Sequence, residues 1–199
     1  MNFNRRHFLG AVVASSTGLV APRTYAAVSS TEPPALLARA RAALDSHGRS
    51  VAYRDVVGLV DFSQASAHPR FTMVDLASGS VTASFLVAHG RGSDPANSGW
   101  AERFSNVPGS NASSRGSFVT GEIYSGKHGR SRKIIGLDAE NSLAAERAIV
   151  IHGAGYVSAS AVVAQGRIGR SEGCFAVSQA EIGEVLARLG PGRLLYAWK

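Results

Sequence analysis

The chain has 199 residues, of which 45% are hydrophobic and 18% charged, a composition typical of a folded globular protein rather than a disordered or collagen-like one. Lys and Arg number 21 against 14 Asp and Glu, and the resulting charge of +7 by itself suggests a polyanionic partner such as nucleic acid. The single cysteine excludes an intramolecular disulfide and a zinc site made of four cysteines.

The first 26 residues have the pattern of a twin-arginine export signal. Arg5 and Arg6 precede residues 8–21, a charge-free and mostly apolar stretch that is too short to span a bilayer. Small residues around Ala26 fit a cleavage site. The alternative, a buried N-terminal helix, leaves the arginine pair unexplained. We therefore expect a bacterial protein exported to the periplasm or cell envelope, with no membrane span once the signal is removed.

Removal of the signal changes the charge argument. Residues 1–26 hold three arginines and no acid, so the rest of the chain has 18 basic and 14 acidic residues and a charge of +4. Aromatic side chains are not interleaved with the basic ones, as they are in many single-strand binding surfaces. We therefore predict no nucleic-acid partner. No feature of the sequence specifies an oligomeric state.

Residues 27–50 are predicted to form a short polar leader and one amphipathic helix. Two prolines open the helical pattern, Gly48 is a plausible stop, and the opposite face carries charged residues that solvent can cover. The apolar positions recur at helical spacing: Leu36, Leu37, Ala40, Ala43 and Leu44.

Residues 51–199 are predicted to form one mainly β domain with flanking helices. Runs rich in β-branched and aromatic residues, separated by Gly- and Ser-rich loops, predict strands, and the first three indicate a meander with a hairpin at 77–80. Helical patterns follow near 158–164 and, more clearly, at 178–189, where Ser178 and Glu181 form a capping-box pattern. The predicted strands are 56–62, 71–76, 81–87, 117–124, 133–137, 148–152 and 194–198.

Cys174 is the candidate nucleophile. A thiol attacks as a thiolate and needs a base or a cation beside it, since its ordinary pKa is about 8.5. His152 ends an apolar strand 22 residues upstream and can supply the base, Arg170 can supply positive charge, and the N–H groups of Gly173 and Cys174 can form an oxyanion hole. The alternative is that Cys174 is a small buried residue and His152 a hydrogen-bonded strand-end histidine.

Two segments carry a resemblance to a known family. Residues 151–158, Ile-His-Gly-Ala-Gly-Tyr-Val-Ser, and residues 169–177, Gly-Arg-Ser-Glu-Gly-Cys-Phe-Ala-Val, resemble the YkuD-like murein L,D-transpeptidase catalytic domain. The likeness continues upstream in blocks at 87–90, 104–110, 113–116, 120–122, 124, 126–129 and 147–150. The resemblance implies a mixed-sheet, sandwich- or barrel-like β fold with flanking helices.

The resemblance also implies a reaction and its residues. It implies cysteine acyl transfer on peptidoglycan stem peptides, with Cys174 as nucleophile, His152 as base, and Ser171 and Gly173 shaping the nucleophile turn. The thioester formed on release of terminal D-Ala would pass to an amine, giving a crosslink, or to water, giving carboxypeptidase activity.

Departures from the family pattern keep a third reading open. Glu172 stands where the wider superfamily has His or Arg, Phe175 where this branch often has Pro, and no Arg follows the cysteine. The His-to-Cys spacing is also a few residues longer than in the wider superfamily. The third reading is a non-catalytic cell-wall-binding domain.

Loop residues supply candidates for substrate binding. We predict that His89, Tyr124, His128 and Tyr156 line the cleft together with Arg170; the alternative for the loop histidines is hydrogen bonding that fixes the loops. The spacings of 39 and 24 residues among His89, His128 and His152 have no zinc-ligand pattern, so we predict neither metal nor cofactor. Basic residues at 115–133 suit the carboxylates of a peptidoglycan stem.

Overall fold

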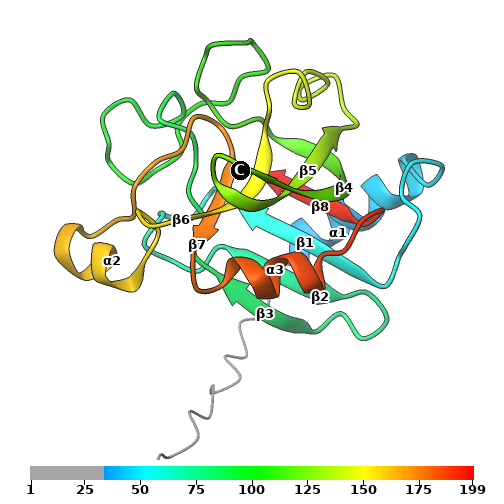
Figure 1. Ribbon diagram of the computed structural model, residues 1–199. Coiled ribbons are helices and arrows are strands. Elements are labelled where there is room, and N and C mark those ends of the chain that lie inside the picture. Colours follow the sequence, from blue (N-terminus) through cyan, green and yellow to red (C-terminus); the bar gives the residue numbers. More distant parts are fainter. Residues whose placement is uncertain (1–33) are drawn as a thin grey trace, which may run out of the picture.

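The structure is a computed structural model that describes residues 34–199, so the predicted signal peptide and the polar leader lie outside the described residues. It consists of one mixed eight-stranded sheet with three helices around it (Figure 1). The elements are α1 (Pro34–Ser46), β1 (Val56–Asp61), β2 (Phe71–Asp75), β3 (Val81–Phe85), β4 (Gly116–Gly126), β5 (Gly129–Gly136), β6 (Val150–Ala154), α2 (Ala159–Gln165), β7 (Phe175–Ser178), α3 (Ile182–Arg188) and β8 (Leu194–Trp198).

The strand order is β3-β2-β1-β8-β4-β5-β6-β7. The predicted meander is confirmed, because β1 pairs antiparallel with β2 and β2 with β3. The C-terminal strand β8 inserts between β1 and β4, parallel to the first and antiparallel to the second. At the far edge β6 and β7 are parallel, and this pair carries the site described below.

The sheet curls until its two edges meet. The segment that follows β3 bridges the opposite edge, with Ala88 opposite Ala176 in β7 and Gly90 opposite Ser171 just before it. Phe175 of β7 packs edge-on against Phe118 of β4 at 5.4 Å and stacks on Phe62, which follows β1, at 6.1 Å. The mainly β, barrel-like fold expected from the sequence is therefore confirmed.

The two faces of the sheet pack against different helices. The inner face forms the main core with Val185 of α3 and with Leu189, which follows that helix, whereas the outer face buries Leu36, Ala40 and Leu44 of α1 (Figure 1). Those three residues belong to the predicted apolar stripe, and full burial of a leucine contributes about 1.5–3 kcal/mol to folding. None of the helices in residues 34–199 is long and apolar enough to cross a membrane.

The structure differs from the sequence-based elements at the C-terminal end. Residues 175–178 form strand β7, which was not predicted, and helix α3 begins at Ile182 rather than at Ser178. The capping residues still meet: the Ser178 hydroxyl accepts a hydrogen bond from the N–H of Glu181 at 3.2 Å and donates to its carboxylate at 2.5 Å. Ser178 thus ends the strand and is joined to the helix by one turn.

Candidate active site

Cys174 and His152 come together through the pairing of β6 with β7. His152 lies opposite Ala176, and Ile151 lies opposite Phe175. Alternate residues of a strand share a face, so Cys174 projects on the same side as Ala176 and His152 while Phe175 enters the core. Residues 153–173, between the two candidates, therefore form a crossover, which includes α2, and return the chain beside the strand it left.

The Cys174 thiol is protonated at neutral pH. Burial raises its pKa, while the N–H of Val150 and the cations Lys127 and Arg147 act to lower it. Sγ lies 3.6 Å from the carbonyl oxygen of Ala148, to which the S–H can donate. Because a protonated thiol is a weak nucleophile, attack requires a base to remove its proton.

His152 is held in the tautomer that such a base needs. The side chain is 2% exposed, and Nδ1 lies 3.0 Å from the carbonyl oxygen of Gly153. A carbonyl only accepts, so Nδ1 carries the hydrogen and Nε2 is left with its lone pair. Burial lowers the pKa of His152, helped by the charges of His128 and Lys127, which keeps the ring neutral at pH 7.

His128 stacks on this ring from the turn between β4 and β5. The two imidazoles are 4.1 Å apart with an angle of 20° between their planes. Burial lowers the pKa of His128, as does the charge of Lys127, so a neutral ring faces a neutral ring. The sequence predicted that His128 lines the substrate cleft. In the structure its ring contacts His152, the candidate base.

Residues 169–174 form the loop that presents the thiol, here called the nucleophile loop. The Ser171 hydroxyl donates to the carbonyl of Cys174 at 2.7 Å and accepts from the N–H of Gly173 at 3.1 Å. The expectation of two oxyanion donors is thereby corrected: the Gly173 N–H is already engaged, because Ser171 folds over it. The Cys174 N–H donates to no other group within residues 34–199 and is left as the oxyanion donor.

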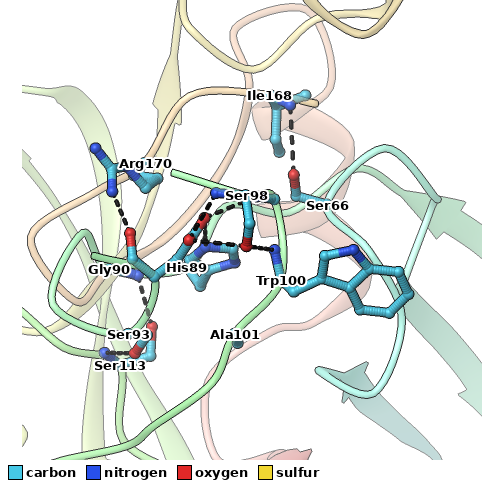
Figure 2. A network of polar contacts seen from close by, with 12 residues as sticks. Ser66, His89, Gly90, Ser93, Ser98, Trp100, Ala101, Ser113, Ile168 and Arg170 are labelled. Carbon is cyan, nitrogen blue, oxygen red and sulfur yellow. Dashed lines mark hydrogen bonds and ion pairs between the residues drawn. The ribbon is translucent and has the colours of Figure 1, made fainter. Parts of the chain in front are cut away.

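The structure corrects the prediction for His89, which does not line a cleft. Its side chain is 1% exposed and lies behind the nucleophile loop (Figure 2), where Nδ1 accepts from Arg70 at 2.7 Å and Nε2 donates to Asp94 at 3.2 Å. Its carbonyl accepts the N–H of Ser171 at 2.9 Å. His89 follows an apolar strand, as a site histidine does, but the bridge between the two sheet edges buries it.

The side chain of Arg170 also lies elsewhere than predicted. Its guanidinium donates to the backbone carbonyl of Asp94 (Figure 2), and its charge acts on His89. The cations that act on the thiol are instead Lys127 and Arg147. The reason is the course of the chain. Arg170 lies on the side of the nucleophile loop that faces His89, and the chain turns toward the thiol only at Gly173.

The two tyrosines fall at different distances from the reacting groups. Tyr156 is 38% exposed, packs over Gly169, and has its pKa raised to about 12 by burial and by Cys174 and Glu172, which places it beside the thiol. Tyr124 lies opposite Ser131, which lies opposite His152, so it is two strands away, and its ring faces the Lys133 ammonium at 5.8 Å.

Comparisons with known proteins decide the family. A family model described as the L,D-transpeptidase catalytic domain matches residues 30–198. The chain belongs to this family. The expectation drawn from the residues around His152 and Cys174 is thus confirmed at the level of the family, whose members are L,D-transpeptidase enzymes.

Solved structures of L,D-transpeptidases match the chain at low sequence identity. An L,D-transpeptidase from Mycobacterium smegmatis is 14% identical, with a TM-score of 0.45, over 73% of this chain and 59% of that one. One from Xylanimonas cellulosilytica is 16% identical, with a TM-score of 0.43, over 79% and 68%. L,D-transpeptidase 3 from Mycobacterium tuberculosis, bound to a faropenem-derived adduct, is 14% identical, with a TM-score of 0.47, over 73% and 60%.

This L,D-transpeptidase domain spans about 59% of the length of the Mycobacterium smegmatis structure. The search of curated proteins gives no match. Within residues 34–199 no group of three or more His, Cys, Asp or Glu side chains is arranged to hold a metal ion.

Arg147 is a site residue of this L,D-transpeptidase domain that sequence reasoning missed. Its guanidinium donates to the carbonyls of Ser105 and Ala112, at 2.6 and 2.5 Å, and to the hydroxyl of Ser114 at 2.6 Å. It thereby ties the 105–114 loop to the chain just before Ala148. The signal available was its place in the block before the His152 strand, but an arginine there reads equally well as a surface charge.

The buried histidine gives a stability prediction. Burial, followed by the charge of Arg70, lowers the pKa of His89 to about 4. The unfolded chain binds a proton there below about pH 6.5 and the folded chain only below about 4, so acid favours unfolding. We expect His89→Gln to lower stability at pH 7 and to reduce the loss of unfolding free energy between pH 7 and pH 4 by roughly 3 kcal/mol.

Urea titrations at the two pH values measure this loss. The matched control is His68→Gln, because His68 is exposed, and it should keep the wild-type difference between pH 7 and pH 4. An unchanged difference in His89→Gln would contradict the assignment.

Proposed function

We propose that the protein is an exported cysteine acyltransferase that acts on peptidoglycan stem peptides, with a thioester on Cys174 as intermediate. One observation carries the proposal: the β6–β7 pairing places a protonated thiol on the same sheet face as a buried imidazole whose Nε2 is unprotonated. Export is proposed from the twin-arginine pattern at Arg5 and Arg6.

The first half-reaction forms the thioester. Sγ of Cys174 attacks the carbonyl carbon between the L-centre of diaminopimelate and the terminal D-Ala while Nε2 of His152 takes the thiol proton. The Cys174 N–H donates to the oxyanion. The carbon–nitrogen bond then breaks, His152 returns the proton to the departing amine, and D-Ala leaves with a neutral amine.

The second half-reaction releases the acyl group. An acceptor amine attacks the thioester carbon, His152 takes a proton from the amine, and the thiolate leaves and is reprotonated by His152. The product is a crosslink. Water in place of the amine gives a shortened stem, the carboxypeptidase outcome.

Mass spectrometry of the protein and of the released products tests the proposal. The protein from residue 27 onward is incubated with a disaccharide tetrapeptide, and its intact mass and the free D-Ala are followed together. An added disaccharide-tripeptide acyl group mapped to Cys174, with one D-Ala released per turnover, supports the acyltransferase; crosslinked dimers identify an amine acceptor and shortened monomers identify water. Absence of both adduct and D-Ala would favour a domain that only binds the cell wall.

The pH dependence of the reaction follows from the base. His152 accepts a proton only when neutral, and burial lowers its pKa below the ordinary 6.5. Activity is therefore lost as pH falls through that lowered pKa. We expect the acidic limb of kcat/KM to have its midpoint below 6.5, measured as D-Ala release between pH 4.5 and 9. A midpoint above 6.5 would contradict the expectation that burial lowers the pKa of His152.

A further inference from the structure

A cleft of about 410 Å³ lies beside His152. Its walls include His128, which stacks on His152, and Gly153, whose carbonyl fixes the His152 tautomer. Two cations line the same cleft: Lys127, in the turn between β4 and β5, and Arg130, near the start of β5. The cleft therefore lies next to the base and is basic in character.

Both cations lack a carboxylate partner within residues 34–199. Some arginines elsewhere in the domain are paired with a carboxylate, as in Arg115 with Glu140 at 2.8 Å and Arg188 with Glu184 at 2.7 Å. Glu172, whose charge acts on the thiol and on His128, pairs with Arg91 at 3.1 Å. Two unpaired cations in one cleft favour an anionic ligand.

The chemistry of the base says which group of the substrate enters this cleft. His152 must give a proton to the departing amine and later take one from the attacking amine, so both amines stand at its Nε2. The groups attached to those amines therefore lie close to His152, beside which this cleft opens. In departing D-Ala the amine carbon carries a free carboxylate.

We propose that Lys127 and Arg130 form one carboxylate subsite that serves both half-reactions. It binds the terminal carboxylate of the donor stem while D-Ala leaves, and then the carboxylate next to the amine of the acceptor. This inference rests on the proposed acyl transfer. Arg170, predicted from the sequence to line the cleft, does not contribute to this subsite, because its guanidinium donates to the Asp94 carbonyl.

A matched pair of donors tests the subsite. One is a tetrapeptide stem ending in D-Ala, and the other is the same stem ending in D-alaninamide, which lacks the charge. In the Lys127→Gln, Arg130→Gln double variant we expect kcat/KM for the carboxylate donor to fall roughly 10- to 100-fold relative to the carboxamide donor, because charge-assisted hydrogen bonds are lost. Arg49→Gln, an exposed cation after α1, is the control and should leave the ratio unchanged.

The ratio between donors separates the subsite from a general electrostatic effect. Lys127 also lowers the pKa of Cys174 and His152, and its loss acts on both donors alike. An equal loss on both donors, or no loss on either, would overturn the subsite. The second half-reaction is read as the ratio of acceptor-extended stem to hydrolysed stem with glycine and with glycinamide as acceptors, and the double variant should lose the preference for glycine.

A binding measurement keeps the proposal independent of turnover. Cys174→Ala is titrated with the two stems by calorimetry, with and without the two glutamine substitutions. If Cys174→Ala binds the carboxylate stem more tightly and the triple variant does not, the subsite is supported. This holds even if the wild-type chain forms no acyl-enzyme, because that result would contradict only the proposed acyl transfer. Equal affinity for the two stems in Cys174→Ala would overturn the subsite even if acyl transfer is observed.

Discussion

Replacement of Cys174 by alanine is expected to abolish D-Ala release from a stem tetrapeptide and to leave the fold intact. The substitution removes the sulfur on which the thioester would form, and loss of a nucleophile costs on the order of 10⁴-fold or more in rate. The side chain is partly exposed, and its polar contacts are with the backbone: the Ala148 carbonyl at 3.6 Å and the Val150 N–H. Its removal should therefore change the free energy of unfolding by less than about 1 kcal/mol.

Parallel measurements of D-Ala release and urea unfolding on the wild type and Cys174→Ala check both halves of this result. Cys174→Ser is the companion variant, since it keeps size and hydrogen bonding but replaces the thiol with a poorer nucleophile. Undiminished D-Ala release from Cys174→Ala would refute the covalent mechanism. Unfolding of that variant would instead show that the thiol has a structural role.

Replacement of Gly173 by alanine should also lower activity, by a smaller factor, for a reason of backbone geometry. Gly173 has φ +117°, a conformation that L side chains rarely adopt. An added Cβ would lie 2.7 Å from the carbonyl oxygen of Ala112 and 2.8 Å from Cδ1 of Ile149. The nucleophile loop must shift, and a displacement of about 1 Å at the reacting atoms costs on the order of 10²-fold in rate.

The shift should also be visible in stability. We expect Gly173→Ala to lower the free energy of unfolding by about 1–3 kcal/mol, the usual cost of overpacking. Gly183→Ala is the control, because nothing lies within 4 Å of its added Cβ in α3 and alanine favours a helix. Steady-state D-Ala release and denaturant titration of both variants provide the measurement; wild-type kcat in Gly173→Ala would show that the loop is not held by this contact.

Much of the secondary structure followed from local pattern. The apolar residues Leu36, Ala40 and Leu44 were placed on the buried face of α1, and the β1–β3 meander was expected from alternating runs. Strand β7 was not expected, because four residues carry too little periodicity to separate a buried strand from a loop that leads into a helix. Its buried pairing with β6 is a long-range contact that no local pattern contains.

Part of the candidate site could likewise be predicted from the sequence, and part could not. Cys174 and His152 were identifiable because their residue types and flanking glycines have few other uses, and the structure brings both to one face of the β6–β7 pair. His89 looked like a cleft residue and is a buried support of the loop, whereas Arg147 looked like an ordinary surface charge and ties down the chain before Ala148. Both differences arise because burial depends on which segments pack together.

Taken alone, the sequence determined the chemical type of the protein: its net positive charge, its single thiol, its mainly β character and its resemblance to L,D-transpeptidases. Only the tertiary structure decided which groups surround that thiol. The bridge from the segment after β3 to β7 buries His89 and diverts Arg170, and the β4–β5 turn brings Lys127 and His128 over the base instead. The physical reason is that the pKa, the tautomer and the solvent access of a side chain depend on residues that are distant in the sequence. Only the folded chain brings those residues next to it.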